Sequence, residues 1–216
     1  MMIGIAGVAG AGKDLFATIL SQTLDKYQIT SHRYALADAL KIEMRPILLD
    51  TYGIDIVACD RATKDAHRPS LVAHGKFRRD SSGGRYWTDK ISERIKLEKP
   101  SGVVCVTDIR YDQYEKDELF WLKEEMSGFL VHVSQFKIQD GVKVMKGGAN
   151  EEEAKYDPIL KSKADYVIEW ESVDISHDNA GSLLQRHIDG FLFWLNKNDE
   201  RRHRLGKCHK KYKLRK

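Results

Sequence analysis

The amino-acid sequence predicts an α/β fold, in which helices cover both faces of a largely parallel β-sheet. Short apolar runs alternate with amphipathic stretches along most of the chain, which is the order expected when strands alternate with crossover helices. The first apolar run also leads through a glycine-rich turn directly into a helical stretch. The 216 residues, 42% hydrophobic and 31% charged, suit one domain, which we assign to residues 1–200.

The glycine-rich turn carries the pattern Gly-x-x-x-x-Gly-Lys-Asp over residues 7–14. Glycines let the backbone turn tightly and aim its N–H groups inward, and the helix N-terminus behind them favours the same anion. A lysine at this position reaches terminal phosphates. The pattern predicts an ATP-binding loop, and a glycine turn that happens to precede a lysine is the alternative. The residues predicted to bind ATP are Gly7, Ala9, Gly10, Ala11, Gly12, Lys13 and Asp14.

The clearest strand after the first, residues 102–108, ends in Asp108. Parallel strands collect their ligands at their carboxyl ends, so we expect Asp108 and Arg110 beside Lys13, as three catalytic residues. The position that usually holds a Mg²⁺-ligating Ser or Thr is Asp14. Asp14 and Asp108 are therefore the predicted Mg²⁺ ligands, directly or through water. A capping aspartate followed by a surface arginine is the alternative at this strand end.

A second strand over residues 31–37 is expected to open into a helix at Asp38, which serves either as its N-cap or as a ligand. Hydrophobic periodicity then fades over a basic insert at about 52–89, where we expect only a short helix at 70–76. Arginines bind phosphate in bidentate fashion and Trp87 offers a stacking face, which suits an anionic substrate with a flat base. A solvated basic surface is the alternative. The basic side chains that carry this argument include Arg61, Lys64, Arg68, Lys76, Arg78, Arg79 and Arg85.

The remaining stretches complete the alternation of strands and helices. Turn chemistry in Asp140-Gly141 and Gly147-Gly148, together with nearby lysines, predicts a mobile lid at about 135–155. The helices expected from apolar spacing are 15–27, 87–99, 111–126 and 179–195, and the remaining strands are 129–134 and 165–170.

Four stretches carry a resemblance to a known family: GVAGAGKD at 7–14, ALADALK at 35–41, RPSLVAHG at 68–75 with the arginines and tryptophan after it, and VTDIRY at 106–111. Together they resemble phage-type deoxynucleoside monophosphate kinases, members of the P-loop nucleoside-monophosphate kinase group. The resemblance covers residue 3 to about residue 170. The first stretch is common to many P-loop proteins, and the combination is far more specific.

The resemblance implies a P-loop NTPase three-layer fold and a kinase that uses ATP and Mg²⁺ to phosphorylate a deoxynucleoside monophosphate (dNMP). It implies that Lys13 binds the donor phosphates and that Asp108 and Arg110 lie between the two nucleotides. A homodimer is a possible oligomeric state. The resemblance implies that the protein acts in the cytoplasm, which is that of the host cell if the gene belongs to a phage. The residues that it puts in the acceptor region are Asp38, Lys41, Arg68, Arg78, Arg79 and Trp87.

Two departures from the family pattern concern charged side chains. The family usually carries a Glu four residues after the motif arginine, where this chain has Tyr114 followed by Glu115. The lid region, residues 135–160, has no arginine, so lysines or Arg110 would have to act on the transferred phosphoryl group.

Phosphomevalonate kinases of animals share the Lys-Asp loop ending and are the alternative family, with dephospho-coenzyme A kinase behind them.

The net charge of +4 arises at the C-terminus. Residues 201–216 carry nine Lys or Arg and no Asp or Glu, so the other 200 residues hold 27 basic against 32 acidic side chains. Such a tail is expected to be flexible, and it either keeps the chain in solution or binds nucleic acid without sequence preference. The second possibility would make the protein an ATP-dependent nucleic-acid-binding protein. Three scattered cysteines, no signal peptide and no membrane-length apolar run favour the cytoplasm and no membrane partner.

Overall fold

A computed structural model describes residues 1–172 and 179–198 of the chain. The basic tail at 201–216 lies outside these residues. The strands are β1 (Met2–Ala6), β2 (Ser31–Ala35), β3 (Val103–Ile109), β4 (Phe129–Gln139), β5 (Val142–Met145) and β6 (Tyr166–Glu171). The helices are α1 (Lys13–Lys26), α2 (Leu36–Tyr52), α3 (Arg61–Ala66), α4 (Arg68–Ser81), α5 (Tyr86–Glu98), α6 (Glu118–Phe120), the π-helical turn η1 (Trp121–Glu125), α7 (Glu151–Lys163) and α8 (Asn179–Asn198).

The predicted α/β fold with a largely parallel sheet is confirmed. Five strands pair in parallel in the order β2-β3-β1-β4-β6, and β5 is antiparallel to the end of β4. The chain leaves β1 for β2, returns through β3 on one side of β1, and continues to β4 on the other side. The carboxyl end of β1 is thus the topological switch point, where open α/β sheets bind their ligands.

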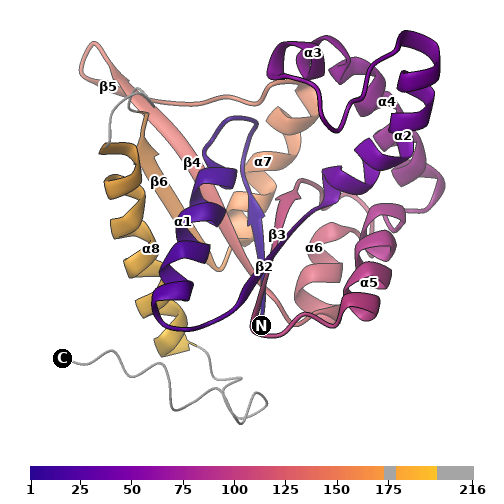
Figure 1. Cartoon of the computed structure of the whole chain (residues 1–216). Coiled ribbons are helices and arrows are strands. Elements are labelled where there is room, and N and C mark those ends of the chain that lie inside the picture. Colours follow the sequence, from indigo (N-terminus) through magenta and orange to yellow (C-terminus); the bar gives the residue numbers. More distant parts are fainter. Residues whose placement is uncertain (173–178, 199–216) are drawn as a thin grey trace.

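Helices cover both faces of this sheet, which makes the three layers (Figure 1). On one face α1 and α8 pack on the sheet and on each other, with the rings of Phe16 and Phe191 6.0 Å apart. On the other face α5, α6, η1 and α7 bury Trp87, Trp121 and Leu160 against the sheet. Helices α2, α3 and α4 gather beyond the sheet edge that lies opposite β5 (Figure 1).

Two helix starts differ from the prediction. α1 begins two residues earlier than expected, at Lys13. α2 begins at Leu36 with Ala35 at its N-cap position, so the N-cap interpretation of Asp38 is wrong. Asp38 instead lies in the first turn, where a carboxylate still favours the helix dipole. Pro46 lies within α2 and does not end it.

The stretch predicted as one charged helix, residues 111–126, needs correction. It runs irregularly as far as Asp117, and only then forms α6 and η1. The Asp117 carboxylate accepts N–H groups from Gln113 at 2.9 Å, from Tyr114 at 3.2 Å and from Glu118 at 2.9 Å. The bonds from Gln113 and Tyr114 satisfy backbone donors within a turn and so compete with a helix, whereas the bond from Glu118 caps α6.

The basic insert over residues 52–89 is helical rather than irregular. Asp60 caps α3 by accepting the N–H of Thr63 at 2.7 Å, and the short helix expected at 70–76 is part of the longer α4. α3 buries no residue and α4 buries only Arg79. Without an apolar stripe, neither helix gives the periodic signal that predicts one.

The predicted lid at 135–155 consists of a hairpin and the first turn of a helix. β4 continues into an antiparallel pairing with β5, and Asp140-Gly141 turns between them with φ of 50° and 75°. Two such residues are typical of tight hairpins. Asn150 then caps α7 with its side chain. The sequence analysis missed α7 because a proline, Pro158, lies inside it and its apolar residues form no stripe.

No helix within the described residues is long and apolar enough to cross a membrane. Cys59 and Cys105 are free thiols, and Cys208 lies outside the described residues.

The packing of α1 on the sheet generates a prediction about stability. Leu20 on this helix is fully buried, so Leu20→Ala removes methyl groups from a packed core and leaves a cavity. We expect the free energy of unfolding to fall by about 2–5 kcal/mol in denaturant titrations. Leu97→Ala is the matched control, because Leu97 is 83% exposed on α5. Equal losses in both variants would contradict the assignment of the core.

Candidate functional site

The loop between β1 and α1 passes so close to two other strands that it tolerates only glycine at two positions. Gly7 has φ of 137°, and a Cβ there would lie 2.2 Å from the carbonyl oxygen of Val133. Gly12 has φ of 93°, and a Cβ there would lie 2.5 Å from the Trp170 ring. The indole N–H of Trp170 donates to the carbonyl of Ala11 at 2.9 Å. The glycines thus let β4 and β6 fix the path of the loop.

Lys13 folds its side chain back into this loop. It is 6% exposed, and its ammonium donates to the carbonyl oxygens of Gly7 at 2.8 Å and of Val8 at 3.0 Å. Burial lowers the pKa of the Lys13 ammonium, an effect that the carboxylate of Asp108 partly offsets. The cation is therefore held by carbonyl groups inside the loop and has no carboxylate bonded to it within the described residues.

Asp108 and Arg110 lie at the carboxyl end of β3, the strand beside β1. Asp108 takes a left-handed conformation with φ of 68°. Arg110 extends its Nη2 atom to 3.5 Å from the Asp108 carboxylate. Burial on its own would raise the pKa of Asp108, but Arg110, Lys13 and Lys41 together hold that pKa below its usual value. The structure therefore brings Lys13, Asp108 and Arg110 together, as the sequence predicts.

Glu153, which the sequence analysis missed, completes this group from α7. Its side chain is almost fully buried, and one carboxylate oxygen accepts the N–H of Ala9 at 3.1 Å and that of Ala149 at 3.0 Å. The other oxygen accepts Nη1 of Arg110 at 2.7 Å. Burial would raise the pKa of Glu153, but the N–H groups of Ala149 and Ala9 and the charge of Arg110 lower it overall. The acidic run 151–153 was the signal that could have found it.

The predicted Mg²⁺ ligands differ in their surroundings. Asp14 is largely exposed and pairs with Arg33 at 2.6 Å, while Asp108 is held ionised among cations. Among residues 1–172 and 179–198, no three acidic, histidine or cysteine side chains cluster around a possible metal position. Mg²⁺ in nucleotide sites is bound by one or two carboxylates, with phosphates and water as its other ligands. Asp108 and Asp14 fit that requirement, and the glycine loop around Lys13 fits a polyphosphate.

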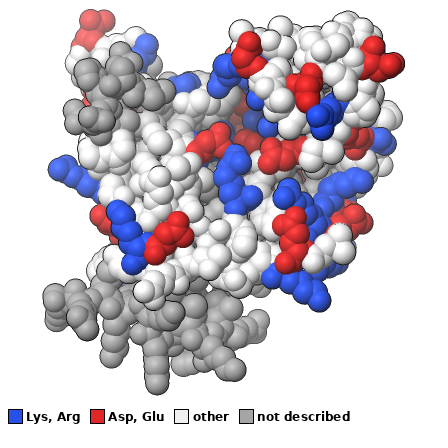
Figure 2. Space-filling view, in the orientation of Figure 1, with Lys and Arg blue, Asp and Glu red and all other residues white. Residues whose placement is uncertain are grey.

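A hollow lies between the hairpin side and the side of α2, α3 and α4, and Figure 2 shows basic and acidic side chains gathered in it. Asp38 and Lys41 pair at 3.2 Å in the first turn of α2. The charge of Lys41 acts on Asp108, so this turn faces the same site. On the hairpin side, Lys146 donates to the carbonyl of Gly10 at 2.9 Å, which puts a lid lysine on the loop.

The four other residues predicted for the acceptor region separate into two pairs. Arg68 pairs with Asp65 and Arg78 pairs with Glu43 at 2.6 Å, and both arginine side chains are more than a third exposed. His74 and Tyr86 also bond to the Glu43 carboxylate, at 2.9 Å and 2.7 Å. Arg78 therefore belongs to a polar cluster shared by α2, α4 and α5.

Arg79 and Trp87 are buried, which corrects the prediction that they contact substrate. Arg79 is 1% exposed, pairs with Asp117 at 3.3 Å, and lies 3.6 Å from the centre of the Tyr111 ring. Trp87 is 5% exposed and donates its indole N–H to the carbonyl of Gly75 at 3.1 Å. Both side chains hold the insert against the rest of the fold and offer no stacking or binding surface.

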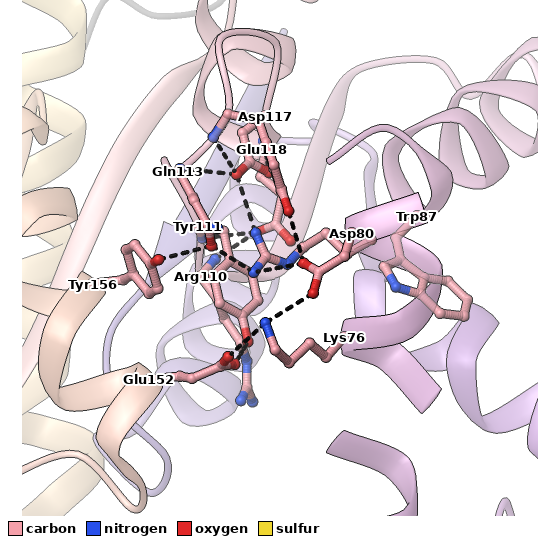
Figure 3. Close-up of polar contacts among 12 residues, drawn as sticks. Lys76, Asp80, Trp87, Arg110, Tyr111, Gln113, Asp117, Glu118, Glu152 and Tyr156 are labelled. Atoms are coloured by element: carbon pink, nitrogen blue, oxygen red, sulfur yellow. Dashed lines mark hydrogen bonds and ion pairs between the residues drawn. The ribbon is translucent and has the colours of Figure 1, made fainter. Parts of the chain in front are cut away.

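Helices α4 and α7 meet across this site through one acidic side chain (Figure 3). Glu152 lies 3.4 Å from the Lys76 ammonium and accepts the Tyr111 hydroxyl at 2.8 Å. Lys76 also pairs with Asp80 at 2.9 Å on its own helix. The first turn of α7 therefore contacts the insert through Glu152 and the glycine loop through the next residue.

Glu118 is a further acidic group that the sequence analysis missed, and it fixes the backbone after β3. Its carboxylate accepts the N–H groups of Arg110 at 2.6 Å and of Tyr111 at 3.1 Å. Burial, with the neighbouring charge of Asp117, raises the pKa of Glu118 to about 8. Glu115, by contrast, is exposed. Glu118 thus positions Arg110 through the main chain.

No protein-family model matches this chain, and no curated protein matches it in sequence. Among solved structures, it is similar to a shikimate kinase from Bacteroides thetaiotaomicron at 11% identity, over 91% of this chain and 98% of that chain, with a TM-score of 0.42. A dephospho-CoA kinase from Campylobacter jejuni matches at 12% identity, over 91% and 97% of the two chains, with a TM-score of 0.42. An uncharacterized protein from Eubacterium ventriosum matches at 16% identity, over 88% and 98%, with a TM-score of 0.30. These likenesses are too low to carry an argument about function.

The buried Glu118 generates a prediction about pH. A carboxyl group whose pKa rises from 4.5 to about 8 on folding binds more protons in the native state, so the free energy of unfolding falls as pH rises between these values. Glu118→Gln stays neutral and can still accept the two N–H groups. We therefore expect the variant to gain stability relative to the wild type from pH 5 to pH 8, in denaturant titrations at several pH values.

Glu115→Gln is the matched control for this experiment, because it removes one acidic charge from an exposed position three residues away. A difference from wild type that stays constant with pH in Glu118→Gln would show that Glu118 is ionised in the folded protein throughout this range.

Proposed function

We propose that this chain is a deoxynucleoside monophosphate kinase, which transfers the γ-phosphoryl group of ATP to a dNMP and releases ADP and a dNDP. The observation that carries the proposal is the buried Lys13 ammonium inside a glycine loop, with Asp108 and Arg110 beside it at the switch point of the sheet. Such a loop binds polyphosphate through its N–H groups and its lysine. The dNMP as acceptor rests on the family resemblance of the sequence.

Phosphoryl transfer requires little beyond in-line positioning and neutralisation of charge. Lys13 and the loop N–H groups hold the donor phosphates, and Arg110 lies where it can contact the transferred phosphoryl group. The predicted lid has no arginine. Lys146, which donates to the Gly10 carbonyl, is the lid cation that we assign to the charge of the transferred phosphoryl group. Asp108 and Asp14 would hold Mg²⁺, directly or through water, and the bound ion would neutralise the outer phosphates.

The acceptor side of the proposal rests on the two arginines that keep exposed surface, Arg68 and Arg78. Each now pairs with a carboxylate, and a monophosphate offers a stronger bidentate partner. Asp38 and Lys41 follow the loop and precede these arginines in the sequence. The charge of Lys41 lowers the pKa of Asp108. An acceptor phosphate bound near Lys41 would thus lie next to the donor site.

A coupled assay of ADP release across candidate acceptors tests the proposal. The acceptors are the four common dNMPs, phosphomevalonate and dephospho-coenzyme A, each with ATP and Mg²⁺. Turnover with one or more dNMPs well above the ATPase background is the expected result. Turnover with another acceptor alone would replace the dNMP assignment, and binding of DNA without any transfer would favour the nucleic-acid-binding alternative.

The loop generates a prediction for Lys13→Ala. The substitution removes the cation that the loop encloses, so turnover should fall by about 10²–10³-fold, as when one preorganised charge-stabilising donor is lost. Steady-state rates at saturating ATP measure this. Lys26→Ala, in the exposed last turn of the same helix, is the matched control. A folded Lys13→Ala variant with normal turnover would refute the donor site.

The acceptor cluster generates a prediction for Arg78→Ala. A hydrogen bond to a charged group contributes about 1.5–3 kcal/mol, so kcat/KM for the dNMP should fall roughly ten- to a hundredfold. ATP affinity, measured by titration without acceptor, should stay constant. Arg94→Ala controls for loss of an arginine with an intrahelical partner, since Arg94 bonds Glu98 at 2.7 Å. Loss of ATP binding in Arg78→Ala would mean that donor and acceptor sides are exchanged.

A further inference from the structure

The buried carboxylate of Glu153 bonds to two groups that the proposed function reserves for phosphate. One of its oxygens accepts the N–H of Ala9, which belongs to the glycine loop, at 3.1 Å. The other accepts Nη1 of Arg110 at 2.7 Å. A planar anion with two oxygens therefore bridges the donor loop and the arginine that we expect on the transferred phosphoryl group.

A carboxylate and a phosphoryl group compete for such donors because both accept charge-assisted hydrogen bonds from arginine and from backbone N–H groups. The Ala9 amide has a single hydrogen, so Glu153 and a bound phosphoryl group compete for it, and they also compete for the guanidinium of Arg110. The Lys13 ammonium lies close enough for its charge to act on the same carboxylate. Two anions at this point would repel each other at short range.

We infer that Glu153 takes the place of the γ-phosphoryl group while the donor site is empty, and that ATP must displace it. ADP lacks that group, so it binds with Glu153 still bonded to Ala9 and Arg110. Glu153 is then a specificity-determining residue that sets the ratio of ATP affinity to ADP affinity. The inference rests on the proposed function, because it assumes that the loop binds ATP.

Displacement of Glu153 would also change contacts on the proposed acceptor side. Glu152, the preceding residue in the first turn of α7, holds Lys76 of α4 and the Tyr111 hydroxyl. A shift of this turn that takes Glu153 off the loop would change those contacts as well. Arrival of the terminal phosphoryl group is thus linked through one helical turn to the insert that we assign to the acceptor.

The experiment compares ATP and ADP affinities in the full-length chain by calorimetric titration with Mg²⁺ and without acceptor. Glu153→Gln keeps the size of the side chain and can still accept the Ala9 N–H, but it loses the negative charge. We expect ATP to bind roughly ten- to a hundredfold more tightly to Glu153→Gln, the range set by a charged hydrogen bond, and ADP to change by less than about threefold.

Glu151→Gln is the matched control, because it removes one acidic charge from the exposed position two residues earlier in the same turn. It should leave both affinities unchanged. Glu153→Asp serves as a second variant if Glu153→Gln does not fold, since the shorter side chain withdraws the charge from Ala9 and should raise ATP affinity to a smaller degree. An unchanged ratio of ATP to ADP affinity, or weaker ATP binding, in a folded Glu153 variant would overturn the inference.

Failure of the inference is separable from failure of the proposed function. A wild-type protein that neither binds ATP nor releases ADP with any acceptor would refute the function itself. A wild-type protein that phosphorylates a dNMP, with an unchanged affinity ratio in Glu153→Gln, would refute only the role of Glu153.

Discussion

The close approach of the glycine loop to the neighbouring strands is the constraint on which the rest of the site depends. At Gly7 the loop leaves no room for a side chain beside the main chain of β4, and at Gly12 none beside the Trp170 ring of β6. The loop is thus held by strands that follow it by more than a hundred residues. Only because its path is fixed in this way can its carbonyl groups enclose the Lys13 ammonium.

The charged groups around this loop stabilise one another as a set. Lys13 and Glu153 are buried, Asp108 and Arg110 are partly buried, and an isolated charge in such a place is costly. The charges of Asp108 and Glu153 act on both cations, and Glu153 also accepts two backbone N–H groups. The arrangement lowers the pKa of Asp108 and of Glu153 and raises that of Arg110, which favours the charged form of all three groups.

The parts that could be predicted from the sequence are those decided by local pattern. The strand, the glycine turn and Lys13 lie within a dozen residues, and Asp108 ends an apolar run, so the topology of a parallel sheet brings them together. Asp117 shows where this approach fails. The N–H groups of Gln113 and Tyr114 bond to its carboxylate where the composition favours a helix, and the same carboxylate caps α6 only afterwards. No periodicity reveals a competition of that kind.

Partners distant in sequence account for the other failures. Arg79 reads as one more exposed cation of a basic insert, yet its ion-pair partner Asp117 lies 38 residues further on. Glu153 reads as the end of an acidic run, yet it bonds to Ala9, which lies 144 residues earlier in the sequence. Local pattern identifies the type of each side chain and the element that carries it. It does not identify the opposite charge, which decides whether the side chain can bind a ligand.

The same difference separates the two proposed halves of the site, one for the phosphoryl donor and one for the acceptor. The half that we propose for the donor is built on backbone groups and on one lysine, whose geometry a short motif largely dictates. The half that we propose for the acceptor is built on helices beyond the sheet edge, joined to α7 by side chains such as Lys76 and Glu152. Selectivity for an acceptor depends on these long side-chain contacts. A sequence motif can therefore predict a phosphate-binding loop more readily than it can predict which molecule accepts a phosphoryl group.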